Sequence, residues 1–475
     1  MVRTGTVAVV HETGSRPRGS RRFHRERRPP FFVIFSIHFA TPNHVLDFLA
    51  FAGGAELSSP SFPMTRLLTL AVLLPIALAT LLVTETKAGP PALAEGVDVS
   101  VPADCKNVKF RGSLENSRIV FEKTGKGHVA FIGGSITEMD GYRPMVCEDL
   151  KKRFPKTEFT FTAAGIASTC STTGAFRLKE QVLDQGPVDL FFVEFAVNDD
   201  QDAHHTRQEC IRGLEGIVRH TRQHNPAADI VVTYFVNEGM LATFKEGKEP
   251  LSSSSHDEVL RHYDIPGIEL NREIFERIEA GKLTWKQFGG VHPAPTGNRI
   301  CANMIDRLLD QAWAKPLATS AVTKPHAMPV PLDPNNYENA HFVDPAQAEI
   351  VKGWTIETPE WSKLPGGHRA RFDKEKMLCA SEPGAEVKLK FDGKGIGIFL
   401  LAGPDAGMLE ASVDGAPAKR FDLFHGYSSG LHYPRSIMFD ADLAPGAHVL
   451  TLKVSDQKNA TSKGTAARIL KFCVN

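Results

Sequence analysis

Apolar and polar positions between residues 126 and 313 follow two different periods. Short, almost continuously apolar runs alternate with longer stretches in which apolar residues recur every three or four positions. The apolar runs are residues 128–133, 159–165, 188–197 and 229–236, and the helical stretches lie near 143–153, 174–184, 205–224, 268–280 and 296–313. Strands that are apolar on both faces are typical of a parallel sheet covered by helices on both sides. The pattern therefore predicts an α/β domain over residues 126–313.

Residues 336–475 follow another pattern, in which short alternating strands are separated by Gly, Pro and Asp turns. Examples are "EVKLKF", "GIGIFLLAG" and "HVLTLKV". Regularly spaced short strands of this kind predict an all-β sandwich, or jelly roll. Residues 314–335 are rich in proline and cannot form a core, so we expect a linker there.

The first 94 residues do not resemble a folded domain. Residues 1–63 include a basic, proline-containing run, and we interpret them as a disordered or mis-assigned upstream extension. Met64 then begins a segment with Arg66, 17 apolar residues from 67 to 83, and the small residues Ala92-Leu93-Ala94. This order predicts a signal peptide over 64–94, and hence a secreted, periplasmic or cell-surface protein, with an N-terminal membrane anchor as the alternative. Residues 95–125 lead into the α/β domain.

Charge and cysteine content narrow the choice of partner and cofactor. The chain has 55 basic and 55 acidic residues, so no field of one sign favours nucleic acid or an anionic membrane. Its seven cysteines include no C-x-x-C pair, and neither a metal site nor an organic cofactor is predicted. A small-molecule or polysaccharide substrate is compatible with this composition.

Four polar or glycine positions follow apolar runs or open the last helix. They are Ser135, Gly165, Asn198 and His292. Ligands bind beyond the carboxyl ends of parallel strands, so we expect these residues to meet at one edge of the sheet. A serine at a strand-to-helix turn is exposed, and the following helix favours negative charge beside it. These residue types suit acyl transfer.

Each of the four residues has a role in such a reaction. Ser135 supplies a nucleophilic hydroxyl, and His292 supplies the base that removes its proton. The N–H groups of Ser135 and Gly165, with the Asn198 amide, supply three donors for an oxyanion. Taken singly, each stretch is more simply explained as a turn or helix cap, and only their joint occurrence favours catalysis.

The four stretches resemble the sequence blocks of the SGNH hydrolases, the family of GDSL-like esterases and lipases. "FIGGSIT", "AAGIAST", "FAVNDD" and "GGVHPAPTG" occur in the order of the family's blocks. The resemblance implies a flavodoxin-like, three-layer α/β/α domain. It also implies that Ser135 is the nucleophile, that His292 is the base, and that Gly165 and Asn198 bind the oxyanion.

One position departs from the family pattern. The family usually has an aspartate three residues before the histidine, and this chain has Gly289 there. Three interpretations follow: a backbone carbonyl orients His292 in a Ser–His pair, a remote acid such as Asp200 or Asp264 reaches it, or the domain is weakly active or inactive. Loss of such a carboxylate costs about 10⁴ in turnover where the triad depends on it.

The C-terminal part resembles the galactose-binding-like β-sandwiches attached to carbohydrate-active esterases, on the strength of "LAPGAHVLTLKVSD" and "AARILKFCV". Trp354, Trp361, Tyr427 and Tyr433 suit either sugar stacking or a core, and residues 422–436 suit a wall of the active site or a glycan-binding loop. We therefore predict an exported serine esterase that removes O-acetyl groups from carbohydrates. The alternatives are an inactive relative that binds glycans and a membrane-tethered lipase or thioesterase.

Overall fold

The computed structural model describes residues 92–475, which belong to one compact unit. The predicted upstream extension, and all but the last three residues of the predicted signal or anchor segment, lie outside the described residues. Within residues 92–475, no helix combines the length and the apolar character needed to cross a bilayer.

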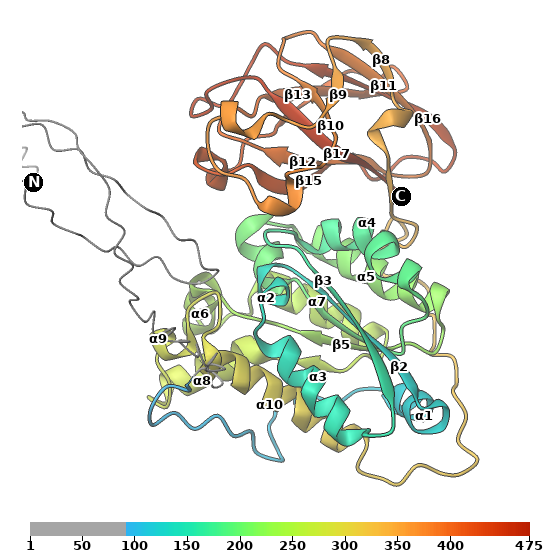
Figure 1. Cartoon of the computed structure of the whole chain (residues 1–475), viewed down its shortest axis with the longest axis vertical. Helices are drawn as coiled ribbons and strands as arrows, with labels where there is room; N and C mark the ends of the chain where they lie inside the picture. Colours follow the sequence, from blue (N-terminus) through green and yellow to red (C-terminus); the bar gives the residue numbers. More distant parts are fainter. Residues whose placement is uncertain (1–91) are drawn as a thin grey trace, which may run out of the picture. The chain divides into compact units, whose positions relative to one another are not determined.

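A parallel sheet forms the centre of the first domain and confirms the predicted α/β class (Figure 1). Its strand order is β1-β6-β5-β4-β2-β3, in which only β1 runs antiparallel to its neighbour. The strands are β1 (Val108–Lys109), β2 (Lys126–Gly133), β3 (Glu158–Gly165), β4 (Leu190–Glu194), β5 (Asp229–Thr233) and β6 (Gly267–Ile268). The four predicted apolar runs correspond to β2 through β5. The strand order changes direction between β2 and β4, where ligands bind in folds of this type.

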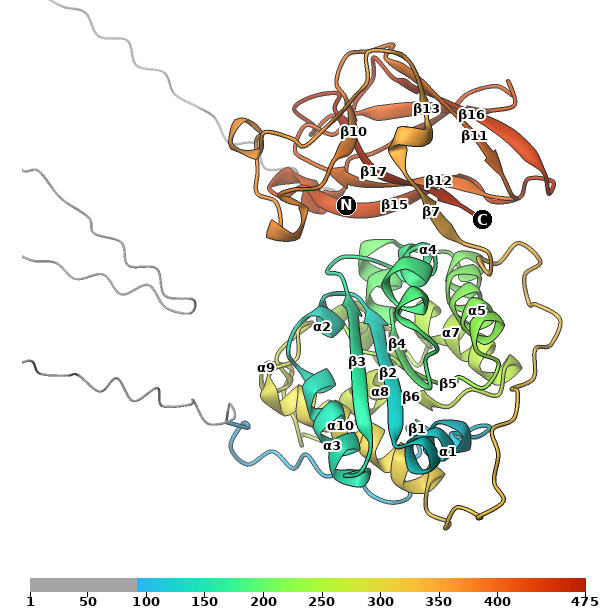
Figure 2. The same cartoon turned by 45° about the vertical axis from the view of Figure 1, so that its right-hand side comes forward.

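Helices cover both faces of this sheet, as Figure 2 shows. On one face α5 packs against α4 and against α7, and on the other face α3 packs against α10. The helices are α1 (Glu115–Thr124), α2 (Ser135–Glu138), α3 (Tyr142–Arg153), α4 (Ser171–Gln181), α5 (Arg207–His224), α6 (Glu238–Lys245), α7 (Leu251–His262), α8 (Leu270–Glu279), α9 (Trp285–Phe288) and α10 (Pro295–Ala312). This three-layer arrangement is the one implied by the family resemblance.

The structure differs from the sequence prediction in the middle of the domain. Two helices, α6 and α7, occupy a segment for which no element was predicted, because four consecutive serines hide the apolar face of α7. The strand predicted over 188–197 is shorter, and β4 ends at Glu194. The chain then turns into the π-helical turn η2 (Asn198–Asp202), which sets the direction of the Asn198 side chain.

The C-terminal domain consists of two antiparallel sheets, as predicted. One has the order β15-β12-β17-β10-β9, with β7 also paired to β17, and the other has the order β14-β13-β16-β11-β8. The strands are β7 (His341–Val343), β8 (Glu349–Lys352), β9 (Thr355–Glu357), β10 (Met377–Ala380), β11 (Glu386–Asp392), β12 (Ile396–Ala402), β13 (Met408–Val413), β14 (Lys419–Asp422), β15 (Tyr433–Asp440), β16 (Ala447–Val454) and β17 (Ala467–Val474). The inward-facing side chains of both sheets form one apolar core.

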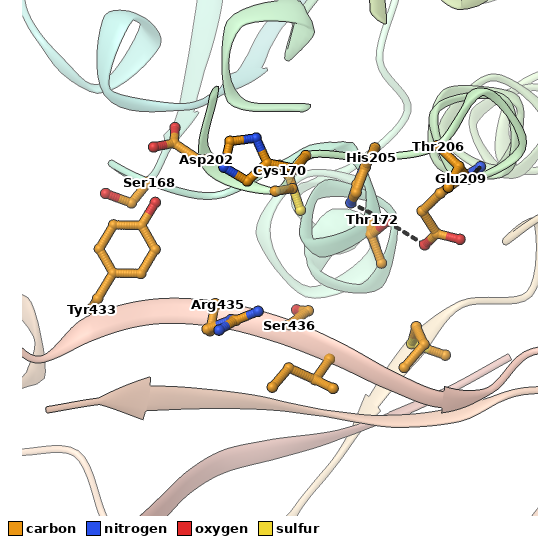
Figure 3. Close-up of a pocket in the computed structure, with 14 residues that line it drawn as sticks. Ser168, Cys170, Thr172, Asp202, His205, Thr206, Glu209, Tyr433, Arg435 and Ser436 are labelled. Carbon is orange, nitrogen blue, oxygen red and sulfur yellow. Dashed lines mark hydrogen bonds between the residues drawn. The ribbon is translucent and has the colours of Figure 1, made fainter. Parts of the chain in front are cut away.

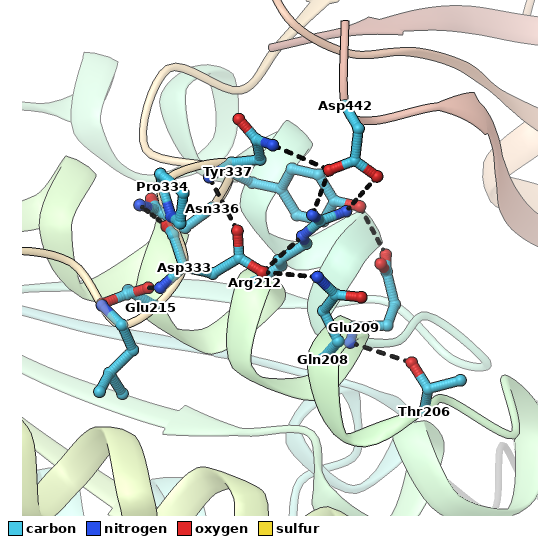
Figure 4. A network of polar contacts seen from close by, with 12 residues as sticks. Thr206, Gln208, Glu209, Arg212, Glu215, Asp333, Pro334, Asn336, Tyr337 and Asp442 are labelled. Atoms are coloured by element: carbon cyan, nitrogen blue, oxygen red, sulfur yellow. Dashed lines mark hydrogen bonds and ion pairs between the residues drawn. The ribbon is translucent and has the colours of Figure 1, made fainter.

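The segment between the two domains, residues 314–340, has no regular secondary structure but is tied along α5 (Figure 4). The buried carboxylate of Glu215 accepts hydrogen bonds from the N–H groups of Leu332 and Asp333, at 2.6 and 2.9 Å. Arg212 forms ion pairs with Asp333 and with Asp442 of the sandwich. These contacts fix the sandwich beside the sheet edge that carries the predicted site residues.

Candidate active site

Ser135 lies where the chain turns from β2 into the one-turn helix α2. The two glycines before it allow an unusually close approach of neighbouring side chains. A Cβ on Gly133 would lie 2.2 Å from Glu194 Oε1, and one on Gly134 would lie 2.1 Å from Asn198 Oδ1. The Gly-Gly pair therefore lets the nucleophile turn rest directly on β4 and on the Asn198 amide.

The turn is hydrogen-bonded to Glu194, a fully buried residue of β4 that the sequence did not point to. Its Oε1 accepts hydrogen bonds from Gly134 N at 2.9 Å, Thr137 N at 3.3 Å and Thr137 Oγ1 at 2.8 Å. Burial raises the pKa of Glu194 to about 7, although the hydrogen bonds from Thr137 and Gly134 act in the opposite direction. A glutamate at the end of an apolar run was the one available signal.

His292 reaches Ser135 from the loop between α9 and α10. Its Nε2 lies 2.8 Å from Ser135 Oγ, and its ring is exposed. The loop is anchored by Asn298, whose Nδ2 donates to Pro293 O at 2.6 Å, and by Pro295 at the first position of α10. The structure thus brings the predicted nucleophile and base into hydrogen-bond contact. The contact allows Ser135 to donate to Nε2 when the ring carries its proton on Nδ1.

Nδ1 of His292 has no hydrogen-bond partner among the described residues, neither a carboxylate nor a backbone carbonyl. Gly289 has φ of 111°, and a Cβ there would lie 1.9 Å from Ala294 N. The local backbone therefore excludes any larger residue at this position. An aspartate on this backbone would not fit.

The two remote acids do not contact His292. Asp200 lies at the correct edge of the sheet, but its Oδ2 accepts a hydrogen bond from Asn237 Nδ2 at 2.8 Å. Asp264 precedes β6 and therefore lies at the amino end of that strand, at the opposite edge. Asp264 lies against Gly112 instead, and no hydrogen bond or ion pair joins it to His292 among the described residues.

Gly165 and Asn198 lie on the other side of Ser135. Gly165 ends β3 directly beside Gly133, and a Cβ on it would lie 2.2 Å from Glu138 N. Asn198 is buried, and its Nδ2 donates to Asp202 Oδ2 at 2.5 Å. An amide nitrogen carries two hydrogens, so Asp202 orients the group while the second N–H stays available for an oxyanion.

Three basic residues of the sandwich touch this same side. Arg371 Nη1 donates to Glu138 Oε1 at 2.5 Å, Arg369 Nη2 donates to Ser168 Oγ at 2.9 Å, and His425 Nε2 lies 2.8 Å from Asp202 O. His425 belongs to the loop 422–436, for which the sequence indicated a wall of the active site or a glycan-binding loop. No local sequence pattern distinguishes Arg369 and Arg371 from other surface arginines.

A pocket of about 350 Å³ opens next to these contacts, between η2 and β15 (Figure 3). Figure 3 shows the Tyr433 hydroxyl directed toward Ser168 and Asp202. Of the other aromatic residues noted in the sequence, Trp354 is buried, Trp361 stacks on His368 at 4.1 Å between ring centroids, and Tyr427 is exposed. Trp354 therefore serves the protein interior, whereas Tyr433 is buried but lines the pocket.

Potential metal ligands gather behind the site around Asp199. Cys170 and His205 lie on one side of this carboxylate, and Cys210 and His256 lie on the other. Both oxygens of Asp199 are already hydrogen-bonded, to Ser171 N and Oγ at 2.7 Å each and to His256 Nε2 at 2.9 Å. Burial opposes ionisation, but His205 and His256 outweigh it and lower the pKa of Asp199. The arrangement is that of a buried ion network linking η2, α4 and α7.

Residues 131–300 match the model of the GDSL-like lipase/acylhydrolase family. The solved structures similar to this chain include a two-domain esterase active on acetylated mannans, crystallised with mannopentaose, at 22% identity and a TM-score of 0.63. The match covers 78% of this chain and 97% of that one. A catalytic mutant of the acetylxylan esterase Axe2 from Geobacillus stearothermophilus is also similar, at 18% identity and a TM-score of 0.32. That match covers 38% of this chain and 94% of the other. No curated protein matches the sequence.

Over residues 131–300 the α/β domain is therefore similar to the GDSL-like lipase/acylhydrolase family. By class the protein is a hydrolase of ester bonds. The likeness to the two-domain esterase extends over both domains and shows that the α/β domain and the sandwich together form a known fold.

Proposed function

We propose that this protein is an exported serine esterase that removes O-acetyl groups from carbohydrates, with Ser135 as nucleophile and His292 as base. The proposal is carried by one observation, the 2.8 Å contact between Ser135 Oγ and His292 Nε2, at a turn flanked by Gly165 and the oriented Asn198 amide. Nucleophile, base and oxyanion donors are the groups that acyl transfer requires.

In the first half of the reaction, Ser135 Oγ attacks the acetyl carbonyl carbon and its proton passes to His292 Nε2. The carbonyl oxygen becomes an oxyanion, which accepts hydrogen bonds from Ser135 N–H, Gly165 N–H and Asn198 Nδ2. When the tetrahedral intermediate collapses, the bond to the sugar oxygen breaks and that oxygen takes the proton from His292. Water, deprotonated by His292, then attacks the acetyl-serine; when the bond to Ser135 Oγ breaks, His292 returns the proton to Oγ and acetate leaves.

The imidazolium that forms in each half-reaction has no protein carboxylate on Nδ1. Because the ring is exposed, we assign water the role of hydrogen-bond acceptor for Nδ1–H. A water molecule stabilises the positive charge less than a buried carboxylate does. We therefore expect a lower turnover than a complete triad would reach. The firmly held oxyanion donors offset part of this loss.

An acetylated polysaccharide is the substrate that the available observations support best. The two-domain esterase with the same fold acts on acetylated mannans and was crystallised with a mannose oligosaccharide. The chain has no excess of either charge that would favour an ionic substrate. Export of the protein is supported by the segment that begins at Met64 and has the order of a signal peptide.

Acetate release from acetylated mannan and acetylated xylan tests the proposal. The wild type, Ser135→Ala and His292→Ala should be compared at equal folded concentration, with Ser100→Ala, an exposed serine remote from the site, as the matched control. We expect acetate release by the wild type and by Ser100→Ala only. Equal rates for the wild type and Ser135→Ala would contradict the assignment of the nucleophile.

The unsupported Nδ1 of His292 favours one second candidate, a glycan-binding protein that retains the esterase fold without turnover. In that case acetylated oligosaccharides would bind the wild type and Ser135→Ala equally, and no acetate would be released. Calorimetric titration of an acetylated manno-oligosaccharide into both proteins, run beside the acetate assay, separates the two functions.

A further inference from the structure

We propose that the β-sandwich is part of the oxyanion site, and that Arg371 and His425 are positioning residues that hold Gly165 and Asn198. The inference rests on the proposed function, because it concerns the same reaction at the same serine. It gives the sandwich a role in turnover itself, separate from any binding of glycan.

Arg371 connects the nucleophile helix to the loop that contains Gly165. Its Nη1 donates to Glu138 Oε1 at 2.5 Å and to the carbonyl oxygen of Gly165 at 3.3 Å. Glu138 is the last residue of α2, and its Oε2 accepts a hydrogen bond from Ala167 N at 2.9 Å. One guanidinium and one carboxylate thus tie together the two segments whose N–H groups face the oxyanion.

His425 connects the sandwich to Asn198 through a single residue. Its Nδ1 accepts a hydrogen bond from Tyr427 N at 3.2 Å, so in the neutral ring the proton lies on Nε2. Nε2 then donates to the backbone oxygen of Asp202 at 2.8 Å. The carboxylate of Asp202 in turn orients the Asn198 amide, and both of these residues are buried. His425 therefore fixes the end of the turn on which the oxyanion amide depends.

The loop after Gly165 needs such support because its backbone is strained. Ser168 has φ of 69°, in the left-handed region that non-glycine residues seldom adopt. Arg369 donates to the Ser168 hydroxyl at 2.9 Å and so contributes a second contact from the sandwich. A strained loop of this kind persists when its surroundings fix it, and here the surroundings are the two arginines.

The contacts act on geometry more than on stability. The Arg371–Glu138 pair is partly exposed, with 36% and 37% of the side chains accessible, and exposed pairs contribute little to folding. A donor that moves by about 1 Å can nevertheless cost about 10²-fold in rate. Losing Arg371 or His425 should therefore reduce turnover without unfolding the protein.

The test uses the full chain and p-nitrophenyl acetate, a substrate too small to need a glycan-binding surface. We expect Arg371→Ala and His425→Phe to lower kcat by roughly 10-fold or more with little change in KM, and Arg371→Lys to recover part of the loss. His425→Phe keeps an aromatic ring stacked on Tyr433, and it removes both the Nε2 donor and the Nδ1 acceptor of Tyr427 N. Asp442→Asn is the matched control, because it weakens the Arg212 pair across the same domain interface away from Ser135.

Hydrogen exchange supplies a readout that does not depend on activity. Peptides covering 163–169 should exchange faster in Arg371→Ala, and peptides covering 198–203 faster in His425→Phe, with neither change in Asp442→Asn. Unchanged exchange together with wild-type kcat would overturn the inference. If the wild type is no faster than Ser135→Ala, the proposed function fails instead, and the exchange data still decide whether the sandwich holds these segments.

Discussion

The two sides of the candidate site are built very differently. On the oxyanion side, Asn198 is buried, bonded to Asp202 and backed by the sandwich. On the base side, His292 is exposed and bonded only to Ser135 among the described residues. Under the proposed function, this difference means that the site relies on preorganised donors for the oxyanion and leaves the base to be oriented by its loop and by water.

The largest expected effect comes from removing the base. His292→Ala should lower kcat for p-nitrophenyl acetate by about 10⁴-fold, because no other side chain in residues 92–475 forms a hydrogen bond with Ser135 Oγ through which to accept its proton. Added imidazole should restore part of the activity, because it can enter the exposed position of the lost ring. A loss of less than 10-fold would mean that the two sides of the site are not both needed.

Removing the oxyanion amide should have the next largest effect. We expect Asn198→Ala to lower kcat by about 10² to 10³-fold and to leave KM nearly unchanged, since the donor acts on charge that develops during the reaction. Asn237→Ala is the matched control, because Asn237 is a buried asparagine at the same sheet edge that bonds Asp200. Equal losses in both variants would indicate a structural effect.

Placing the family's aspartate at position 289 should lower the free energy of unfolding. Gly289→Asp places a Cβ against Ala294 N at positive φ, and we expect a cost of about 2 kcal/mol or more in the free energy of unfolding, with no gain in kcat. Gly290→Asp is the control, because its φ is also positive at 79° but a Cβ there has no neighbour within 4 Å. Thermal unfolding of both variants measures the difference. A more active Gly289→Asp would show that the loop can accept a triad.

The smallest effect concerns the glutamate below the nucleophile. The folded-state pKa of Glu194, about 7, lies above the ordinary value of 4.5, so the folded protein takes up its proton more readily than the unfolded chain. The free energy of unfolding should therefore fall as the pH rises from about 4.5 to 7, by a few kcal/mol at most, and then level off.

Denaturant unfolding at pH 5 and pH 8 measures this contribution. The fall should be reduced in Glu194→Gln and unchanged in Glu158→Gln, which alters an exposed glutamate at the start of β3. The same pH dependence in Glu194→Gln and the wild type would contradict the assigned pKa shift.

Local patterns in the sequence were sufficient to predict the sheet and the edge at which Ser135, Gly165 and Asn198 lie. Strands β2 to β5 contain runs rich in apolar residues. Ser135 and Asn198 come after β2 and β4, and Gly165 ends β3, so the topology of a parallel sheet brings them to one edge. The sequence offered Asp264 as a remote acid that could reach His292. Its position at the amino end of β6 could not be predicted, because that strand has only two residues and carries no periodicity.

The residues that hold the site in position could not be predicted from the sequence, for a different reason. Arg371 and His425 are more than 200 residues away from Glu138 and Asp202, and contacts across that separation depend on how the sandwich docks. Glu194 is one acidic residue in an apolar run, and its burial follows from the closeness of Gly133 and Gly134. Such contacts are set by tertiary packing, which single-residue propensities do not encode.

The most direct test of the account is covalent labelling of the nucleophile. Diethyl p-nitrophenyl phosphate should phosphorylate Ser135, with release of one p-nitrophenolate per chain, and peptide mass analysis should place the added diethylphosphoryl group on that residue. The account predicts fast labelling of the wild type and very slow labelling of His292→Ala. Labelling at another residue, or equal rates in the two proteins, would contradict the assignment of Ser135 and His292 as the catalytic pair.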